Sequence, residues 1–214
     1  MSQTITIADY GVGNLYSVRS ALEHCSATPV MATTYDEVLA ADRLLLPGVG
    51  AFGDSMKGMH RTGMFDAVRD FATKERPLLG ICLGMQMLLS DSEEFGLNDG
   101  LNLIPGHVKM IPDAGSDGRS HRVPHVGWAP IFSPPSITEW STSLLKGIPQ
   151  NTAFYFVHSL YSVTADPSHL IANCDYDGQA LGAVVQNGPI FGCQFHPEKS
   201  AQAGLTMIKN FLDL

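Results

Sequence analysis

The sequence predicts an α/β protein, in which helices flank a central, mostly parallel sheet that is extended by antiparallel strands. Up to Ser90, short apolar runs alternate with helical patterns, which is typical of a doubly wound sheet. Residues 77–81 are almost wholly apolar, as expected of a strand that is buried on both faces. After Ser90, short strand patterns follow one another with turns between them, which favours antiparallel additions.

The first half of the chain should supply the parallel strands and their helices. Apolar runs predict strands at 4–9, 29–32, 43–46 and 77–81. Apolar spacings of three and four predict helices at 15–25, 36–41 and 64–74, and helix-forming residues follow at 85–89. Sites in such sheets form beyond the carboxyl ends of the strands. The turn 11–14, the loop 47–53 and Cys82 should therefore lie at one edge of the sheet.

The second half should supply the added strands and a final helix. The expected strands are 106–111, 125–128, 153–158, 169–175, 179–186 and 190–195. Residues 112–123 and 133–143 are rich in Pro, Ser, Gly and Asp, which predicts surface loops. A helix at 201–212 should bury Leu205, Ile208 and Leu212. No stretch resembles an interdomain linker, so residues 1–214 are expected to form a single domain.

Composition excludes several classes of function. The net charge is −8 and no basic run occurs, which argues against nucleic acid and acidic membranes as partners. No apolar run approaches the ~18 residues of a transmembrane helix, and no signal peptide is recognisable. The four cysteines lack the spacing of a zinc site or a disulfide framework, so we expect no metal and a cytoplasmic location. Gly11 and Gly13 begin a dinucleotide fingerprint, but Tyr16 stands at its third glycine, so no cofactor is expected.

Cys82 stands at the turn between a predicted strand and the helical residues after it. The pattern Gly80-Ile81-Cys82-Leu83-Gly84 is the cysteine form of a nucleophile elbow. Its two glycines suit a turn where side chains would collide with strand and helix. The positive end of a helix dipole at that position favours a negative charge. These residues alone also fit a small buried cysteine in a glycine-rich turn.

The segment Phe195-His196-Pro197-Glu198 ends the last predicted strand. Proline favours extended geometry at the residue before it, so His196 and Glu198 can face the same side. A carboxylate beside an imidazole fixes its tautomer and raises its basicity, as in a nucleophile–base–acid relay. A surface histidine near an unrelated glutamate is the alternative. The elbow lacks a base and this segment lacks a nucleophile, which favours pairing them.

Other histidines are weaker candidates. His158 ends an apolar strand and is a rival base, but no carboxylate adjoins it, so we interpret it as a residue that lines the site. His121 and His125 flank a short segment with a proline and could be solvated loop residues.

Taken together, the elbow and the His196–Glu198 segment resemble the class I (triad) glutamine amidotransferases and their fold. The resemblance runs from Ile5 to the final helix. It is greatest to the branch whose members supply ammonia to a (β/α)8 cyclase subunit in histidine biosynthesis. The motifs that narrow it are Asp9–Leu15, Pro47–Phe52, Pro124–Trp128 and Tyr155–Ser159.

This resemblance implies a glutaminase that releases glutamate and ammonia through a cysteine thioester. Cys82 would be the nucleophile, His196 the general base and acid, and Glu198 the residue that orients His196. The oxyanion would be bound by the Leu83 N–H and by an N–H from the loop Gly48-Val49-Gly50, where the Val49 peptide could flip as a switch. The α-groups of glutamine would be held by Gln86, His158, Ser159 and Leu160.

The resemblance also implies a heterodimer with the cyclase, because ammonia must reach a second active site before water protonates it. Glutaminase activity should be low in the free chain and rise when the partner binds its ligand. The docking residues would be Tyr10, Gly11, Asn14, Trp128 and Lys199.

Two positions depart from the family pattern. Leu160 replaces a usual Tyr, and Ala129 replaces a common Asn. They leave open a paralogue that feeds another acceptor, such as a sugar in polysaccharide synthesis. A stand-alone γ-glutamyl cysteine hydrolase and a non-catalytic binding module are further alternatives.

Overall fold

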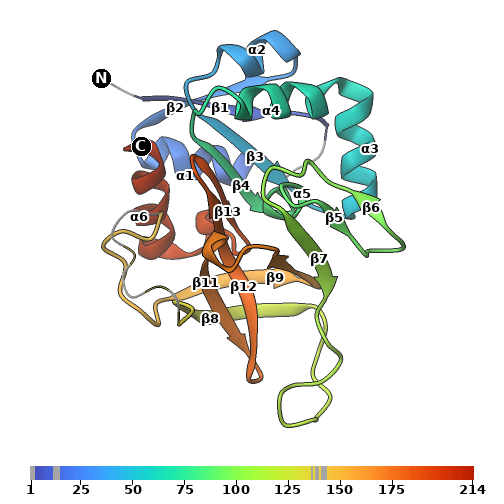
Figure 1. The fold of residues 1–214 in the computed structure, drawn as a ribbon. Coiled ribbons are helices and arrows are strands. Elements are labelled where there is room, and N and C mark those ends of the chain that lie inside the picture. The colour runs from blue at the N-terminus through green and yellow to red at the C-terminus, as the bar shows by residue number, and fades with distance from the viewer. Residues whose placement is uncertain (1–2, 12–14, 136, 138–139, 141–143) are drawn as a thin grey trace.

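Five parallel strands form one half of the sheet in the computed structural model, which describes residues 3–11, 15–135, 137, 140 and 144–214 (Figure 1). In order across the sheet they are β2 (Ala27–Ala32), β1 (Gln3–Ala8), β3 (Leu44–Gly48), β4 (Leu78–Cys82) and β13 (Ile190–Cys193). Their apolar sequences suit burial on both faces. The prediction of a parallel core flanked by helices is confirmed.

Helices cover both faces of this half, and each face has its own core. One face is covered by α1 (Leu15–His24) and α6 (Ala201–Leu212). The other is covered by α2 (Tyr35–Ala40), α3 (Phe52–Thr62), α4 (Met64–Ala72) and α5 (Leu83–Met87). Side chains of a strand alternate between faces, so Leu45 packs into the first core and Leu44 and Leu46 into the second.

Mostly antiparallel strands extend the sheet beyond β13. The continuing strands are β12 (Gln179–Asn187), β10 (Leu160–Thr164), β7 (Gly106–Met110), β5 (Asp91–Ser92) and β6 (Asn98–Asp99). A branch from β12 contains β11 (Leu170–Tyr176), β8 (His125–Phe132) and β9 (Ala153–His158). Two 3₁₀ turns, η1 (Pro167–His169) and η2 (Pro197–Lys199), complete the elements. The predicted antiparallel additions are therefore present.

The sequence did not predict helix α3, strand β10, the two-residue strands β5 and β6, or the two 3₁₀ turns. Helix α3 begins at Phe52, inside the loop predicted at 47–53, and Gly53 and Gly58 hide its helical pattern. Its buried residues Phe52, Met56 and Met59 do carry the spacing of a helix face. Strand β10 follows directly after Ser159, where the chain bends at the end of β9.

Two burial predictions need correction. In α6, Leu205 is only half-buried, whereas Met207 and Phe211 are fully buried beside the predicted Ile208 and Leu212. In the predicted surface loop 133–143, Trp140 is buried and its Nε1–H donates a hydrogen bond to the Ile171 carbonyl at 3.2 Å. The polar residues that surround Trp140 in the chain gave no indication that its side chain is buried.

Within the part of the chain that the structure describes, every helix is too short or too polar to cross a membrane.

Close backbone contacts fix α5 against the strands that precede it. A Cβ atom on Gly84 would lie 1.9 Å from the Leu46 carbonyl oxygen, and one on Gly48 would lie 2.6 Å from the Gly84 nitrogen. Both neighbours are backbone atoms, which cannot rotate away. The glycines therefore let α5 start directly above β3.

We predict that Gly84→Ala destabilises the protein by about 3 kcal/mol. The added methyl group would collide with the backbone of β3, so β3 or α5 would have to move out of its packed position. Urea unfolding measures this change. Gly58→Ala, within α3, is the matched control, since a Cβ at this position would make an ordinary 3.5 Å contact with the Tyr10 side chain. Gly58→Ala should stabilise the protein by up to about 1 kcal/mol, because alanine loses less conformational entropy than glycine when the helix forms. Equal unfolding midpoints for Gly84→Ala and the wild type would contradict this view of the elbow.

Candidate active site

Strand pairing brings three distant segments to one edge of the sheet. Gly48 pairs with Cys82 across β3 and β4, and Cys193 pairs with Ile81 across β13 and β4. The loop after β3, the turn after β4 and the segment after β13 therefore begin side by side. These segments contain the predicted oxyanion loop, the predicted nucleophile and the predicted base.

Cys82 occupies a strained turn. Its φ of 55° and ψ of −112° lie outside the ordinary regions for a side-chain-bearing residue. Gly80 permits this turn, because a Cβ there would lie 2.6 Å from the Gly84 carbonyl oxygen. The sulfur lies 3.9 Å from the Val157 carbonyl oxygen and 3.8 Å from the Gln194 side-chain nitrogen.

His196 lies between the sulfur and a buried carboxylate. Its Nδ1 is 2.9 Å from Oε1 of Glu198, whose side chain is 2% exposed. Burial by itself lowers the pKa of His196, but hydrogen bonds to Cys82 and Glu198 outweigh it and raise the pKa to about 9. The backbone is fixed as well, because the His196 N–H donates to the Tyr155 carbonyl and the Ser200 hydroxyl donates to the His196 carbonyl.

A cavity of about 370 Å³ opens above the sulfur. This volume is within the range of small-molecule sites. The predicted residues that line it are Val49, Gly50, Cys82, Leu83, Gln86, His158, Ser159, Leu160, His196 and Lys199, and it is also lined by Glu94, Pro124 and Val157. Gly48 is not among them, since its Cα faces Leu83 and Gly84.

Two predicted substrate-binding residues have polar atoms that are already occupied. The Gln86 amide nitrogen donates to the Leu160 carbonyl at 3.2 Å and to Oε1 of Gln194 at 2.9 Å. His158 Nδ1 is 2.7 Å from the Leu160 carbonyl oxygen, and its Nε2 is 3.1 Å from His125 Nδ1. The amide nitrogen of Gln86 and the ring of His158 thus hold the wall of the cavity together.

His125 is a buried neighbour of His158, and not the solvated loop residue that its sequence context suggested. The two residues are cross-strand partners in β8 and β9. His121 is likewise packed, with its side chain 5% exposed beside Asp177. Burial lowers the pKa of His158 to about 4, so its ring is neutral near pH 7.

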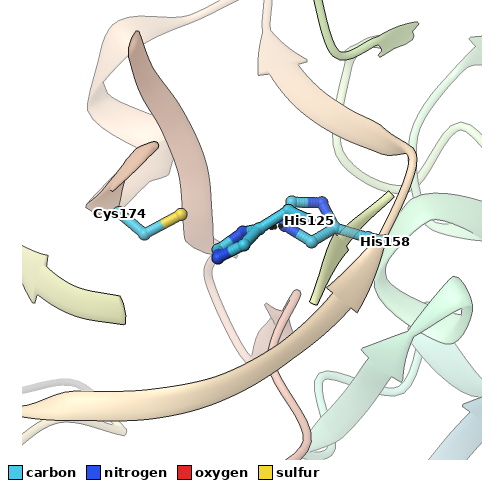
Figure 2. A group of neighbouring side chains, drawn as sticks. All are labelled: His125, His158 and Cys174. Carbon is cyan, nitrogen blue, oxygen red and sulfur yellow. Dashed lines mark hydrogen bonds between the residues drawn. The ribbon is translucent and has the colours of Figure 1, made fainter. Parts of the chain in front are cut away.

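Cys174 approaches the same pair (Figure 2). One potential metal-ligand atom from each of His125, His158 and Cys174 lies within 4.8 Å of the others. The hydrogen bond between the imidazoles engages one nitrogen of each ring, Nδ1 of His125 and Nε2 of His158. Burial also raises the pKa of the Cys174 thiol to about 12, so it is protonated near pH 7. The absence of a metal stays a prediction.

The predicted docking residues do not share one environment. Tyr10 is fully buried and its hydroxyl donates to the Pro47 carbonyl at 2.8 Å, so its side chain is not a docking residue. Residue 10 adjoins a predicted turn, so the sequence did not indicate that the Tyr10 side chain points into the protein. Gly11 is exposed, and Asn14 lies outside the described residues.

A connected aromatic surface lies beside the cavity. Trp128 is 55% exposed and lies 6.0 Å from the ring of its cross-strand partner Tyr155. Lys199 Nζ is 5.9 Å from the Tyr155 ring centroid, and Lys199 also lines the cavity. Val126, two residues before Trp128, is 57% exposed. We call Val126, Trp128, Tyr155 and Lys199 the aromatic face. Ala129 points the other way, into the core.

Two further residues of the site were not predicted from the sequence. Glu94 lines the cavity, and its Oε2 accepts a hydrogen bond from the first N–H of α3, on Phe52, at 2.5 Å. Because α3 was not predicted, Glu94 could not be recognised from the sequence as the acceptor for the first N–H of a helix. Gln194 directly follows β13, and its place beside Cys82 comes from the pairing of Cys193 with Ile81, which the sequence does not reveal.

Comparisons with known proteins point to one family. The profile of the family described as "Glutamine amidotransferase class-I" matches residues 6–214. A Legionella pneumophila (strain Paris) protein named imidazole glycerol phosphate synthase subunit HisH 1 is 46% identical over 211 residues, covering 99% of both chains. A subunit HisH from Methanosarcina barkeri is 44% identical over 211 residues, covering 98% of both. A crystal structure named glutamine amidotransferase has a TM-score of 0.71 at 15% identity, covering 98% of this chain and 97% of that one, which shows the fold.

We predict that His196 titrates near pH 9 and that Glu198→Gln lowers its pKa toward 6.5. The variant replaces the Glu198 carboxylate, one of the two groups that stabilise the imidazolium, with a neutral amide. A histidine with a raised pKa contributes stability that is complete below its unfolded value of 6.5 and lost as pH rises through 9. The stability advantage of the wild type over Glu198→Gln should shrink across that window. Imidazole NMR and urea unfolding measure the two effects. His158 is the internal control and should remain neutral down to about pH 4 in both proteins. A wild-type His196 midpoint at 6.5 would contradict the assignment.

Proposed function

The chain belongs to the class I glutamine amidotransferase family, and on this premise we propose that it is the glutaminase subunit of an imidazole glycerol phosphate synthase. It would hydrolyse glutamine to glutamate and deliver the ammonia to a cyclase subunit in histidine biosynthesis. The observation that carries the proposal is the meeting of Cys82 and His196 at one cavity, with the buried Glu198 carboxylate behind His196. Identity of 44–46% across whole chains supports the choice of branch.

Cys82, His196 and Glu198 act in sequence on the side-chain amide of glutamine. The Cys82 sulfur transfers its proton to His196 and attacks the amide carbon, while Glu198 holds the imidazole through Nδ1. His196 then protonates the departing nitrogen, and ammonia leaves a thioester on Cys82. Water, deprotonated by His196, hydrolyses the thioester to glutamate. A reduced thiol is essential, which agrees with the cytoplasmic location that we expect.

Backbone N–H groups bind the oxyanion formed in these steps. The Leu83 N–H follows the nucleophile, as elbow geometry requires. A second donor comes from the loop Gly48-Val49-Gly50, of which Val49 and Gly50 line the cavity. Gly50 has a φ of 93° and a Cβ there would meet no atom within 4 Å, so this part of the loop has room to rotate. One such donor contributes about 2.7–4 kcal/mol, enough for a peptide flip to switch activity.

The charged ends of glutamine find partners at the rim of the cavity. Glu94 presents a carboxylate that suits the α-ammonium group, and Lys199 presents an ammonium that suits the α-carboxylate. Ser159 and the backbone at Leu160 contribute hydrogen-bonding groups on the same wall. Gln86 and His158 shape that wall, since their nitrogens bind within the protein.

The partner in this proposal is a (β/α)8 cyclase that covers the aromatic face. Ammonia that escapes into water becomes ammonium and is no longer a nucleophile, so the cavity needs a cover that leads to the acceptor. Trp128 and Tyr155 are large anchors of the kind enriched at interfaces, and Lys199 joins them to the cavity. This exposed face favours a subunit over a stand-alone hydrolase.

The test combines the chain with the histidine-pathway cyclase and measures glutamate and imidazole glycerol phosphate. We predict that Cys82→Ala abolishes glutamine-dependent synthesis and preserves ammonia-dependent synthesis, because only the thioester step requires the sulfur. Glutamate release by the wild type should be low alone and rise when the cyclase binds its ligand.

Cys25→Ala is the matched control, since this sulfur lies against the Leu205 carbonyl far from the cavity. It should leave both syntheses intact. Glutamate release by Cys82→Ala, or equal release with and without cyclase, would refute the proposal.

We further predict that Trp128→Ala weakens cyclase binding about 30-fold, since a central aromatic anchor is worth about 2 kcal/mol. Titration calorimetry measures the change. Tyr35→Ala is the control, because Tyr35 is 39% exposed on α2, across the molecule from β8 (Figure 1). Equal affinities for Trp128→Ala and the wild type would place the interface elsewhere.

A further inference from the structure

The side chain of Gln194 is fully buried beside the nucleophile. Its exposed fraction is 0%, and its Nε2 lies 3.8 Å from the Cys82 sulfur, within hydrogen-bonding range for sulfur. It follows β13, whose residue Cys193 pairs with Ile81, so its place beside Cys82 comes from the sheet register. A buried carboxamide needs partners for both of its ends.

One backbone carbonyl determines which end of Gln194 faces the sulfur. The Leu160 carbonyl can only accept, so the Gln86 atom 3.2 Å from it must be the amide nitrogen. That same nitrogen is 2.9 Å from the Gln194 side chain, which must therefore present its oxygen. The remaining end of Gln194 is the N–H₂ group, and it faces Cys82. A flip of Gln194 would place two donors together, and a flip of Gln86 would place its oxygen against two acceptors.

The Leu160 carbonyl is itself held in place. His158 Nδ1 lies 2.7 Å from it, and the low pKa of His158 keeps this ring neutral. Because the carbonyl can only accept, the neutral ring carries its proton on Nδ1, and its Nε2 is then the acceptor toward His125. The Leu160 carbonyl thus accepts from both His158 and Gln86, which fixes the orientation of the Gln86 amide and, through it, that of Gln194.

The N–H of Gln194 distinguishes the two protonation states of the sulfur. A thiol can donate to the Val157 carbonyl at 3.9 Å, whereas a thiolate can only accept. When the proton moves from the sulfur to His196, the electron pair stays on the sulfur and accepts from Gln194. No other reactant is involved. The donor therefore favours the state that attacks the substrate.

We propose that Gln194 is a further catalytic residue, which stabilises the Cys82 thiolate through a hydrogen bond whose direction is set by Gln86. This inference rests on the proposed glutaminase function. Gln86 is accordingly a positioning residue, because it acts on the sulfur only through Gln194. The same geometry explains why the amide nitrogen of Gln86 points away from the substrate although Gln86 lines the cavity.

The test uses Gln194→Met, which keeps the length of the side chain and removes the donor. Alkylation of Cys82 by iodoacetamide at pH 7 should slow about tenfold, since hydrogen bonds to charged groups are among the stronger ones. The difference should vanish at high pH, where the sulfur is deprotonated in both proteins. The turnover number for glutamine in the complete complex should fall about tenfold with KM unchanged, while ammonia-dependent synthesis stays intact.

Gln186→Met is the matched control, because Gln186 lies on the neighbouring strand β12, half-exposed, with its amide bonded to the Gly188 carbonyl. It should match the wild type in both assays. Gln86→Met should give a smaller effect of the same kind. Gln194→Glu retains the shape if Gln194→Met fails to fold, and it should be slower still because it places a carboxylate near the sulfur.

An unchanged alkylation profile in Gln194→Met would overturn the role of Gln194. An equal loss at all pH values would also overturn it, since that result indicates a purely structural effect. Either result is distinguishable from failure of the proposed function, which the Cys82→Ala measurement decides separately.

Discussion

The pairing of β4 between β3 and β13 is the constraint on which the whole site depends. It aligns Gly48 with Cys82 and Cys193 with Ile81, so the proposed oxyanion loop, nucleophile and base all leave the sheet at one edge. A slip of one residue would turn the side chains of a strand to the opposite face. Apolar packing on both faces prevents this, because alternate residues of β3 are committed to different cores.

Two buried imidazoles beside one cavity have opposite electrostatic environments. Burial disfavours the charged form of both. His196 overcomes it through Cys82 and Glu198, whereas His158 faces a backbone carbonyl and another histidine and remains neutral. The first therefore suits the proton transfers of the proposed reaction, and the second is a neutral part of the cavity wall. The difference arises because Cys82 and Glu198 raise the pKa of His196, whereas burial dominates at His158.

Strand β9 connects the cavity with the aromatic face. Val157 and His158 line the cavity, while Tyr155 lies beside Trp128 on the outer surface. The Tyr155 carbonyl also accepts the backbone hydrogen bond of His196. A partner that covers the aromatic face would therefore contact the same strand that positions the base. This arrangement supplies a short physical route for coupling between subunits.

The sequence by itself determined the parallel core, the elbow around Cys82 and the pairing of His196 with Glu198, because these are local patterns of apolar runs, glycines and spacing. Helix α3 was hidden by its glycines, and with it the position of Glu94. Tertiary structure alone decided that Tyr10 turns inward, that His125 is buried against His158 and that Gln194 faces the sulfur. Each depends on contacts between residues more than thirty positions apart, and no local pattern encodes the direction in which a side chain meets such a distant partner.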